Sequence, residues 1–173
     1  MSIIVNHQKK FIMCHVPKTG GTMIKEILID KFGLSGWMGG HKPIYQIENW
    51  KEYYSFSFVR NPYTRMQSAY RHLYSTNEYK KSFDEFCKNP PNHVLVKPQH
   101  YFLTRNNEIL VSKLGRYENI ENDFREILNK IGLDDKIKIS HIRKGDVSIK
   151  TTLNTENKEN IFKKYKKDFG KIF

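Results

Sequence analysis

The sequence predicts an α/β fold, a single three-layer domain at 1–173 with a central parallel sheet and a P-loop-like nucleotide-binding core. Residues 11–16 are an apolar run of strand length, followed by a glycine turn and a helical pattern. Residues 55–59 alternate polar and apolar side chains, and a helical pattern follows again. The length of 173 residues suits one domain and is short for two. Strands that alternate with helices form a parallel sheet whose ligands bind at the carboxyl ends of the strands.

The first predicted strand leads into a turn rich in glycine. Pro17 ends the strand because proline has no N–H group for a sheet ladder. The turn consists of Lys18, Thr19, Gly20, Gly21 and Thr22. Apolar residues then recur at helical spacing, so a helix N-terminus with free N–H groups follows a buried strand directly. Glycines let a phosphate approach the backbone, and the lysine and threonines add a charge and hydroxyl donors, so we interpret this turn as a nucleotide-phosphate site.

This turn differs from the common P-loop. In the GxxxxGK[ST] pattern the lysine follows the last glycine, whereas Lys18 precedes both glycines. No acidic residue follows a later strand in the manner of a Walker-B aspartate. A turn that merely begins a helix is the simpler interpretation unless a second motif supports ligand binding.

The other elements are predicted from caps, turn residues and periodicity. Asn61 and Pro62 indicate a helix start, because asparagine caps helices and proline suits the first helical position. Ser82 and Glu85 have the spacing of a capping box. After the first helix we expect a loop at 32–49, a strand at 55–59, helices at 62–75 and 82–87, a helical or irregular segment at 94–104, a strand at 108–114, a helix at 120–131, a short strand at 136–139, a loop at 144–154 and a helix at 156–169.

The composition indicates a globular protein with an anionic partner. Apolar residues make up 38% and aromatic residues 13%, which supports a packed core. Thirty Lys and Arg against eighteen Asp and Glu give a net charge of +12, which favours a charged nucleotide, an anionic glycan, nucleic acid or an anionic lipid surface. Cys14 and Cys87 have no regular spacing, which predicts free thiols and no metal framework. The N-terminus is too short and polar for a signal peptide and no run could span a membrane, so we expect a cytoplasmic protein.

A second motif, FSFVRNPYTRMQSAY, occupies residues 56–70. Arg60 ends the predicted strand, and Ser68 lies in the following helix. A guanidinium can bind a phosphate in bidentate fashion, and a serine hydroxyl adds a donor. The motif resembles the 3′-phosphate-binding segment of sulfotransferases that use 3′-phosphoadenosine 5′-phosphosulfate (PAPS), and PKTGGT resembles their 5′-phosphosulfate loop.

The resemblance to PAPS-dependent sulfotransferases extends over most of the chain. HKPIYQI from residue 41, GRYENIENDF at 115–124 and the C-terminal YKKDFGKIF resemble segments of short glycan-type members, and HIRKGD at 141–146 resembles a basic loop that closes over the nucleotide. The resemblance implies transfer of a sulfuryl group from PAPS to a hydroxyl acceptor, leaving adenosine 3′,5′-bisphosphate and using no metal. We expect the acceptor to be a carbohydrate.

The resemblance also implies roles for individual residues. Lys18 would stabilise charge on the bridging oxygen as the sulfuryl group leaves, and the turn and helix start after it would hold the 5′-phosphate. Arg60 and Ser68 would hold the 3′-phosphate, with help from Arg143 and Lys144 unless these two are plain surface charge. The residues expected to bind the nucleotide are Lys18, Thr19, Gly20, Gly21, Thr22, Met23, Arg60, Ser68, Arg143 and Lys144.

Sulfuryl transfer to a hydroxyl needs a base beside the acceptor oxygen, and a histidine of near-neutral pKa suits that task. His41 follows two glycines in the loop expected to face the acceptor, where similar enzymes carry a histidine or glutamate. An ordinary loop histidine is the alternative interpretation. The other candidates for the base are His15, His72, His100 and Glu48.

Two residues near the motifs have open roles. Arg65 lies three residues before Ser68 and so shares its helix face. It could reach the nucleotide, but a structural salt bridge is the favoured prediction. Tyr117 could stack on adenine or belong to the core.

Two other classes of function stay open. A small nucleotide kinase or other phosphotransferase would require magnesium and is disfavoured by the missing GxxxxGK[ST] pattern. A non-catalytic nucleic-acid-binding module would bind DNA or RNA in a salt-sensitive manner. Neither explains why Arg60 and Ser68 follow a strand in the expected order, so we expect a saccharide partner rather than nucleic acid. The sequence does not predict the oligomeric state.

Overall fold

The computed structural model describes residues 3–34, 37–38, 40–136 and 146–173. Within these residues the main sheet has five strands in the order β3-β1-β2-β4-β7. Their bounds are β1 Ile3–Asn6, β2 Phe11–Cys14, β3 Trp37–Met38, β4 Tyr54–Val59 and β7 Lys113–Arg116. β2, β4 and β7 run parallel, which confirms the predicted α/β class and the parallel core of the sheet.

Strands β1 and β3 correct the expectation of a wholly parallel sheet. β1 pairs antiparallel with both β2 and β3, and its register joins Ile3 to Cys14 and Asn6 to Phe11. All four β1 residues are buried. Four residues are too few for a clear periodic pattern in the sequence. They form a strand because Ile4 packs into the core on one face of the sheet, while Ile3 and Val5 pack into the core on the other face.

The strand predicted at 108–114 is wrong in its extent. β6 (Glu108–Ile109) pairs with β5 (Thr104–Arg105) in a separate hairpin, and the main-sheet strand begins only at Lys113. Asn106 and Asn107 connect the hairpin with φ angles of 49° and 70°, a left-handed backbone that asparagine tolerates. The first two residues of the predicted strand, 108–109, therefore pair within this local hairpin and not in the main sheet. The short strand predicted at 136–139 lies largely outside the described residues.

The helices begin at the predicted caps. The Asn61 side chain accepts a hydrogen bond from the Tyr63 N–H at 2.9 Å, and Ser82 accepts one from the Glu85 N–H at 3.2 Å. The α-helices are α1 Gly21–Asp30, α2 Pro62–Ser75, α3 Phe83–Lys88, α4 Gln99–Leu103, α5 Ile120–Lys130 and α6 Thr155–Lys171, and the 3₁₀ helices are η1 Ile44–Gln46, η2 Trp50–Glu52, η3 Val94–Val96 and η4 Tyr117–Asn119. Among the residues that the structure describes, no helix is long and apolar enough to cross a membrane.

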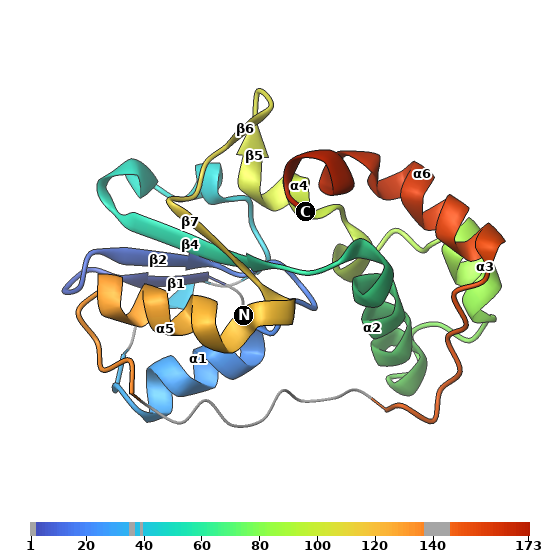
Figure 1. Cartoon of the computed structure of the whole chain (residues 1–173), viewed down its shortest axis with the longest axis horizontal. Helices are drawn as coiled ribbons and strands as arrows, with labels where there is room; N and C mark the ends of the chain where they lie inside the picture. Colours follow the sequence, from blue (N-terminus) through green and yellow to red (C-terminus); the bar gives the residue numbers. More distant parts are fainter. Residues whose placement is uncertain (1–2, 35–36, 39, 137–145) are drawn as a thin grey trace.

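Helices cover both faces of the main sheet (Figure 1). α1 and α5 pack on one face through a cluster that includes Phe56 and Phe124. η1, α4 and the end of α6 pack on the other face through Ile44, Phe102 and Ile172. α2, α3 and α6 form a third group beside the sheet. This arrangement places the chain segments that leave β2 and β4 side by side, between α1 and α2.

Candidate functional site

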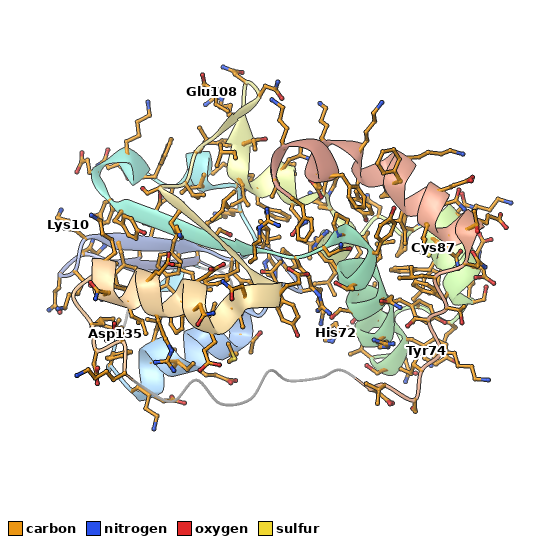
Figure 2. The ribbon with its side chains drawn as sticks, viewed as in Figure 1. Lys10, His72, Tyr74, Cys87, Glu108 and Asp135 are labelled. Atoms are coloured by element: carbon orange, nitrogen blue, oxygen red, sulfur yellow. The ribbon has the colours of Figure 1, made fainter. Side chains whose placement is uncertain are left out.

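A cavity of about 530 Å³ lies where β2 leads into α1 and β4 leads into α2. It is lined by His15, Pro17, Lys18, Gly20, Gly21, Thr22, Met23, His41, Arg60, Ser68, Arg71, His72, Ser75, Leu95, Tyr117, Ile120 and Asp146. His72, labelled in Figure 2, marks the side of α2 that lines this cavity. The cavity therefore brings together most of the residues predicted from two separate motifs.

The turn between β2 and α1 has a backbone that its sequence makes possible. Lys18 and Gly20 adopt left-handed φ angles of 67° and 86°, and α1 begins at Gly21. A Cβ atom at Gly20 would lie 2.5 Å from Ile120 Cδ1, and one at Gly21 would overlap the His15 ring. Close packing therefore favours glycine at both positions, and the left-handed backbone favours it at Gly20 as well.

The N-terminus of α1 is open toward the cavity. It has no side-chain cap and no acidic residue in its first turn, and Gly21, Thr22 and Met23 line the cavity. Free N–H groups and the helix dipole make such an end favourable for an anion. The Thr19 side chain differs from the expectation, because it is buried and its hydroxyl donates to the Val16 carbonyl at 2.8 Å. Thr19 thus stabilises the turn, and it is not among the residues that line the cavity.

Arg60 and Lys18 meet across the cavity although they follow different strands. An Arg60 Nη1 N–H points at the Lys18 carbonyl at 3.5 Å, and the Arg60 guanidinium lies 4.0 Å from the centre of the Tyr117 ring. Burial lowers the pKa of both cations, and the Arg60 charge lowers the pKa of Lys18 further. Two partly buried cations at one cavity favour binding of a multiply charged anion.

Tyr117 packs against the core, which is one of its two predicted alternatives, and it has a second contact at the cavity. Its ring packs against the core cluster below α1 and α5, and it also lines the cavity beneath Arg60. A guanidinium over an aromatic face is a stabilising arrangement that fixes the plane of the cation. Tyr117 therefore orients Arg60 in this structure.

Helix α2 presents one polar face to the cavity. Ser68 lies there as predicted, together with Arg71, His72 and Ser75, which follow it at helical spacing. Arg71 was not predicted, although its position three residues after Ser68 is the signal that could have found it. Its guanidinium donates to the Ile149 carbonyl at 3.3 Å and to the Thr151 hydroxyl at 2.6 Å, so α2 also holds the segment that follows Asp146.

Arg65 corrects the expectation of a salt bridge. It is fully buried, and its guanidinium donates to the carbonyls of Pro17, Leu95 and Lys97 at 3.0, 3.2 and 2.8 Å. No carboxylate among the described residues lies within ion-pair distance of it. Arg65 instead ties the turn between β2 and α1 to the segment before α4.

His41 has a defined tautomer in this structure. Its Nδ1 lies 3.1 Å from the His15 carbonyl, which can only accept, so Nδ1 carries the proton and Nε2 has a free lone pair. Burial lowers the pKa of His41 below its ordinary value of 6.5. Burial lowers the pKa of His15 to about 3, with a further contribution from His41. Both rings line the cavity, and their centres are 5.1 Å apart.

The remaining base candidates separate into two groups. His72 lines the cavity, and its pKa is lowered first by burial and then by the Lys18 charge. His100 lies outside the cavity lining and binds Asp168 at 2.8 Å. Glu48 is exposed and also outside the lining. The structure therefore brings His15, His41 and His72 toward Lys18 and leaves His100 and Glu48 elsewhere.

The charge of the cavity wall is unbalanced in the part of the chain described. Three cationic side chains, Lys18, Arg60 and Arg71, face one carboxylate, Asp146, which the sequence did not predict. Arg143 and Lys144 lie outside the described residues. No group of three metal-ligating side chains occurs within the described ranges. The arrangement suits an anion held by N–H, hydroxyl and guanidinium donors, next to a histidine that can accept a proton.

Comparison with known proteins agrees with this geometry. An uncharacterized protein of Archaeoglobus fulgidus is 34% identical over 89 residues, which are 50% of this chain and 74% of that protein. No solved structure matches the chain. The model of the sulfotransferase family matches residues 1–170, nearly the whole chain. A cavity built from a strand–turn–helix anion site and a second arginine–serine pair thus occurs in a chain that belongs to the sulfotransferase family.

Proposed function

We propose that this protein transfers a sulfuryl group from PAPS to a hydroxyl acceptor, and that the acceptor is a carbohydrate. The observation that carries the proposal is the convergence of two motifs on one cavity. Lys18 and the start of α1 come from the first motif, and Arg60 and Ser68 come from the second. PAPS carries anionic groups at both its 5′ and 3′ ends, so two cationic subsites in one cavity suit it.

The residues present fit this donor. The first turn of α1 and Lys18 would hold the 5′-phosphosulfate, because they combine free N–H groups with a cation. Arg60 and Ser68 would hold the 3′-phosphate, and the Tyr117 ring beneath Arg60 keeps its guanidinium oriented. The excess of cations over carboxylates at the cavity wall supports the same assignment.

The chemistry needs charge stabilisation and one proton acceptor. The donor supplies an activated sulfuryl group, whose S–O bond to the 5′-phosphate breaks as the acceptor oxygen bonds to sulfur. Lys18 would stabilise the negative charge that remains on the phosphate oxygen. His41 would take the proton of the acceptor hydroxyl at Nε2, since its Nδ1 proton is donated to the His15 carbonyl. His15 and His72 are the alternatives for this base.

Two of the segments that line the cavity support a carbohydrate acceptor. His41 belongs to HKPIYQI, and Tyr117 and Ile120 belong to GRYENIENDF, the two segments that resemble glycan-type sulfotransferases. The cavity also carries hydroxyl and imidazole groups of Ser75 and His72 that can bind sugar hydroxyls. A cytoplasmic location stays a prediction, and the two cysteines, which are buried free thiols in the structure, are compatible with it.

Calorimetric titration with adenosine 3′,5′-bisphosphate, AMP and ATP tests the donor assignment. A charge-assisted pair of hydrogen bonds to the 3′-phosphate should make the bisphosphate bind about 10-fold to 100-fold more tightly than AMP. This preference should not need magnesium. Equal binding of the bisphosphate and AMP, or tight binding only of ATP with magnesium, would overturn the proposal and favour a phosphotransferase. Salt-sensitive binding of DNA or RNA without nucleotide binding would favour a nucleic-acid module.

A further inference from the structure

Arg60 reaches the cavity from a short backbone segment between β4 and α2, and this segment has one unusual partner. The Gln99 side chain binds both backbone groups of Arg60. Its Oε1 accepts from the Arg60 N–H at 2.9 Å, and its Nε2 donates to the Arg60 carbonyl at 2.8 Å. Gln99 is fully buried, with 0% of its surface exposed. A buried amide that satisfies both its donor and its acceptor on one residue fixes that residue in position.

Gln99 is itself held by the last helix of the described chain. Its backbone N–H donates to Asp168 Oδ2 at 2.8 Å, and the next N–H, of His100, donates to Asp168 Oδ1 at 2.9 Å. Asp168 is also 0% exposed, and it lies on α6. The start of α4 is therefore anchored by α6, and the Gln99 side chain extends from this anchor to the Arg60 backbone.

The Arg60 guanidinium needs such support because it has no carboxylate partner in the described structure. The guanidinium contacts the Thr64 hydroxyl at 3.0 Å, the Lys18 carbonyl at 3.5 Å and the Tyr117 ring. These neutral contacts orient the guanidinium but hold it weakly, so its position depends on where its backbone is held.

We infer that Gln99 is a positioning residue that fixes Arg60 for binding of the nucleotide 3′-phosphate. Gln99 touches neither the cavity nor a ligand, and it acts only through the Arg60 backbone. The inference rests on the proposed function, in which Arg60 binds that phosphate. Without the Gln99 contacts, the Arg60 backbone shifts and its side chain loses alignment with the 3′-phosphate, while the 5′ subsite on α1 keeps its structure.

The test is the affinity for adenosine 3′,5′-bisphosphate relative to AMP, measured by calorimetry on the full chain. Gln99→Met keeps the length of the side chain and removes both hydrogen bonds. We expect it to weaken bisphosphate binding about 5-fold to 20-fold, part of the value of a charge-assisted contact, and AMP binding by less than about 2-fold. A loss that is equal for both nucleotides would assign Gln99 a merely structural role and overturn the inference.

Tyr165→Phe is the matched control. Tyr165 is fully buried on α6, and its hydroxyl donates to the Val96 carbonyl at 2.6 Å, so the variant removes a buried hydrogen bond from the segment just before Gln99. It should lower the melting temperature and leave the ratio of the two affinities unchanged. A changed ratio in Tyr165→Phe would mean that any loosening of this segment disturbs Arg60, which contradicts a specific role for Gln99.

A second Gln99 variant and the affinity ratio of the wild-type protein complete the test. If Gln99→Met does not fold, Gln99→Leu also removes both hydrogen bonds and fills the buried site with an apolar side chain, and it should show the same selective loss. The ratio of the wild-type affinities for the bisphosphate and AMP separates a failure of the proposed function from a failure of the inference about Gln99. A wild-type protein that does not distinguish the bisphosphate from AMP contradicts the proposed function itself. A wild-type preference that Gln99 variants retain contradicts only the inference about Gln99.

Discussion

Lys18 shows how much of the site depends on single residues. It adopts a left-handed backbone with φ of 67°, which is uncommon for a residue with a Cβ atom. The neighbouring residues explain this backbone conformation. Arg65 binds the Pro17 carbonyl on one side of Lys18, and on the other side the surrounding side chains confine Gly20 and Gly21. Lys18 is therefore turned into the cavity by a turn whose other residues are already fixed.

Substitution of Lys18 by methionine should reduce turnover with little change in fold. Methionine keeps the length and the apolar stem but removes the cation, and loss of one preorganised electrostatic group costs about 10²-fold to 10³-fold in kcat. Lys10→Met is the matched control, because Lys10 has φ of 51° and lies on the β1–β2 turn far from the cavity (Figure 2). Steady-state kinetics with PAPS and a thermal melt measure both effects. Turnover within 3-fold of wild type, on the order of normal scatter between variants, would exclude Lys18 from catalysis.

The proposed role of His41 as the base predicts how catalysis depends on pH. Only the neutral ring can accept a proton, and burial places the pKa of His41 below 6.5. Because kcat/KM reports the free enzyme, it should be constant at neutral and alkaline pH and should fall only as the pH drops through this lowered pKa. His41→Gln should lower the plateau about 10²-fold and remove the acid limb. A pH profile of kcat/KM measures this.

His72→Gln is the control for that experiment. His72 also lines the cavity and also has a lowered pKa. If His41 is the base, the His72 variant should keep the acid limb of the wild-type profile. Loss of the limb in His72→Gln, with the limb retained in His41→Gln, would assign the base to His72.

At the scale of elements, the site depends on the junction between β2 and α1. Gly21 begins α1 directly against the His15 ring, and the carbonyl of His15 binds His41. One packing contact therefore connects the start of α1 to the proposed base. The open N-terminus of α1 differs from those of α2, α3 and α6, each of which has a side-chain cap.

A pair of glycine substitutions tests this junction. Gly21→Ala should destabilise the protein by about 1–3 kcal/mol, because the added methyl group overlaps the His15 ring and overpacks the junction. Gly170→Ala, in α6 where no atom lies within 4 Å of the added carbon, should be neutral or stabilising by up to about 1 kcal/mol. Chemical denaturation of both variants measures the difference. Equal stability of the two variants would show that the His15 ring moves freely away from α1.

At the scale of the whole molecule, the order of strands creates the cavity. β2 and β4 are neighbours and run parallel, so the turn after β2 and the arginine after β4 emerge at the same edge of the sheet. α6 then supports both motifs from behind, through Asp168 and Gln99 to Arg60 and through Tyr165 to the segment that Arg65 binds. The C-terminal helix, for which the sequence predicted only its range of 156–169, is therefore part of the framework of the site.

The sequence by itself determined the parts of this protein that depend on local chemistry. The helix caps at Asn61 and Ser82, the parallel core strands and the two motifs that meet at the cavity follow from residues close together in the chain. Such features can be predicted because proline, glycine and cap residues act within a few positions of themselves. Arg60 lies just before α2 and Ser68 lies within it, and both were predicted to meet one ligand.

Only the tertiary structure decided the features that join distant segments. β1 becomes a strand by pairing with β2, and the Asn106–Asn107 turn takes residues 108–109 away from the main sheet. Arg65, predicted to form a salt bridge, binds three carbonyls instead. Gln99 and Asp168 act on residues far away in the chain. A buried polar group takes whatever partner the fold brings within hydrogen-bond distance, and that distance is set by packing rather than by sequence spacing.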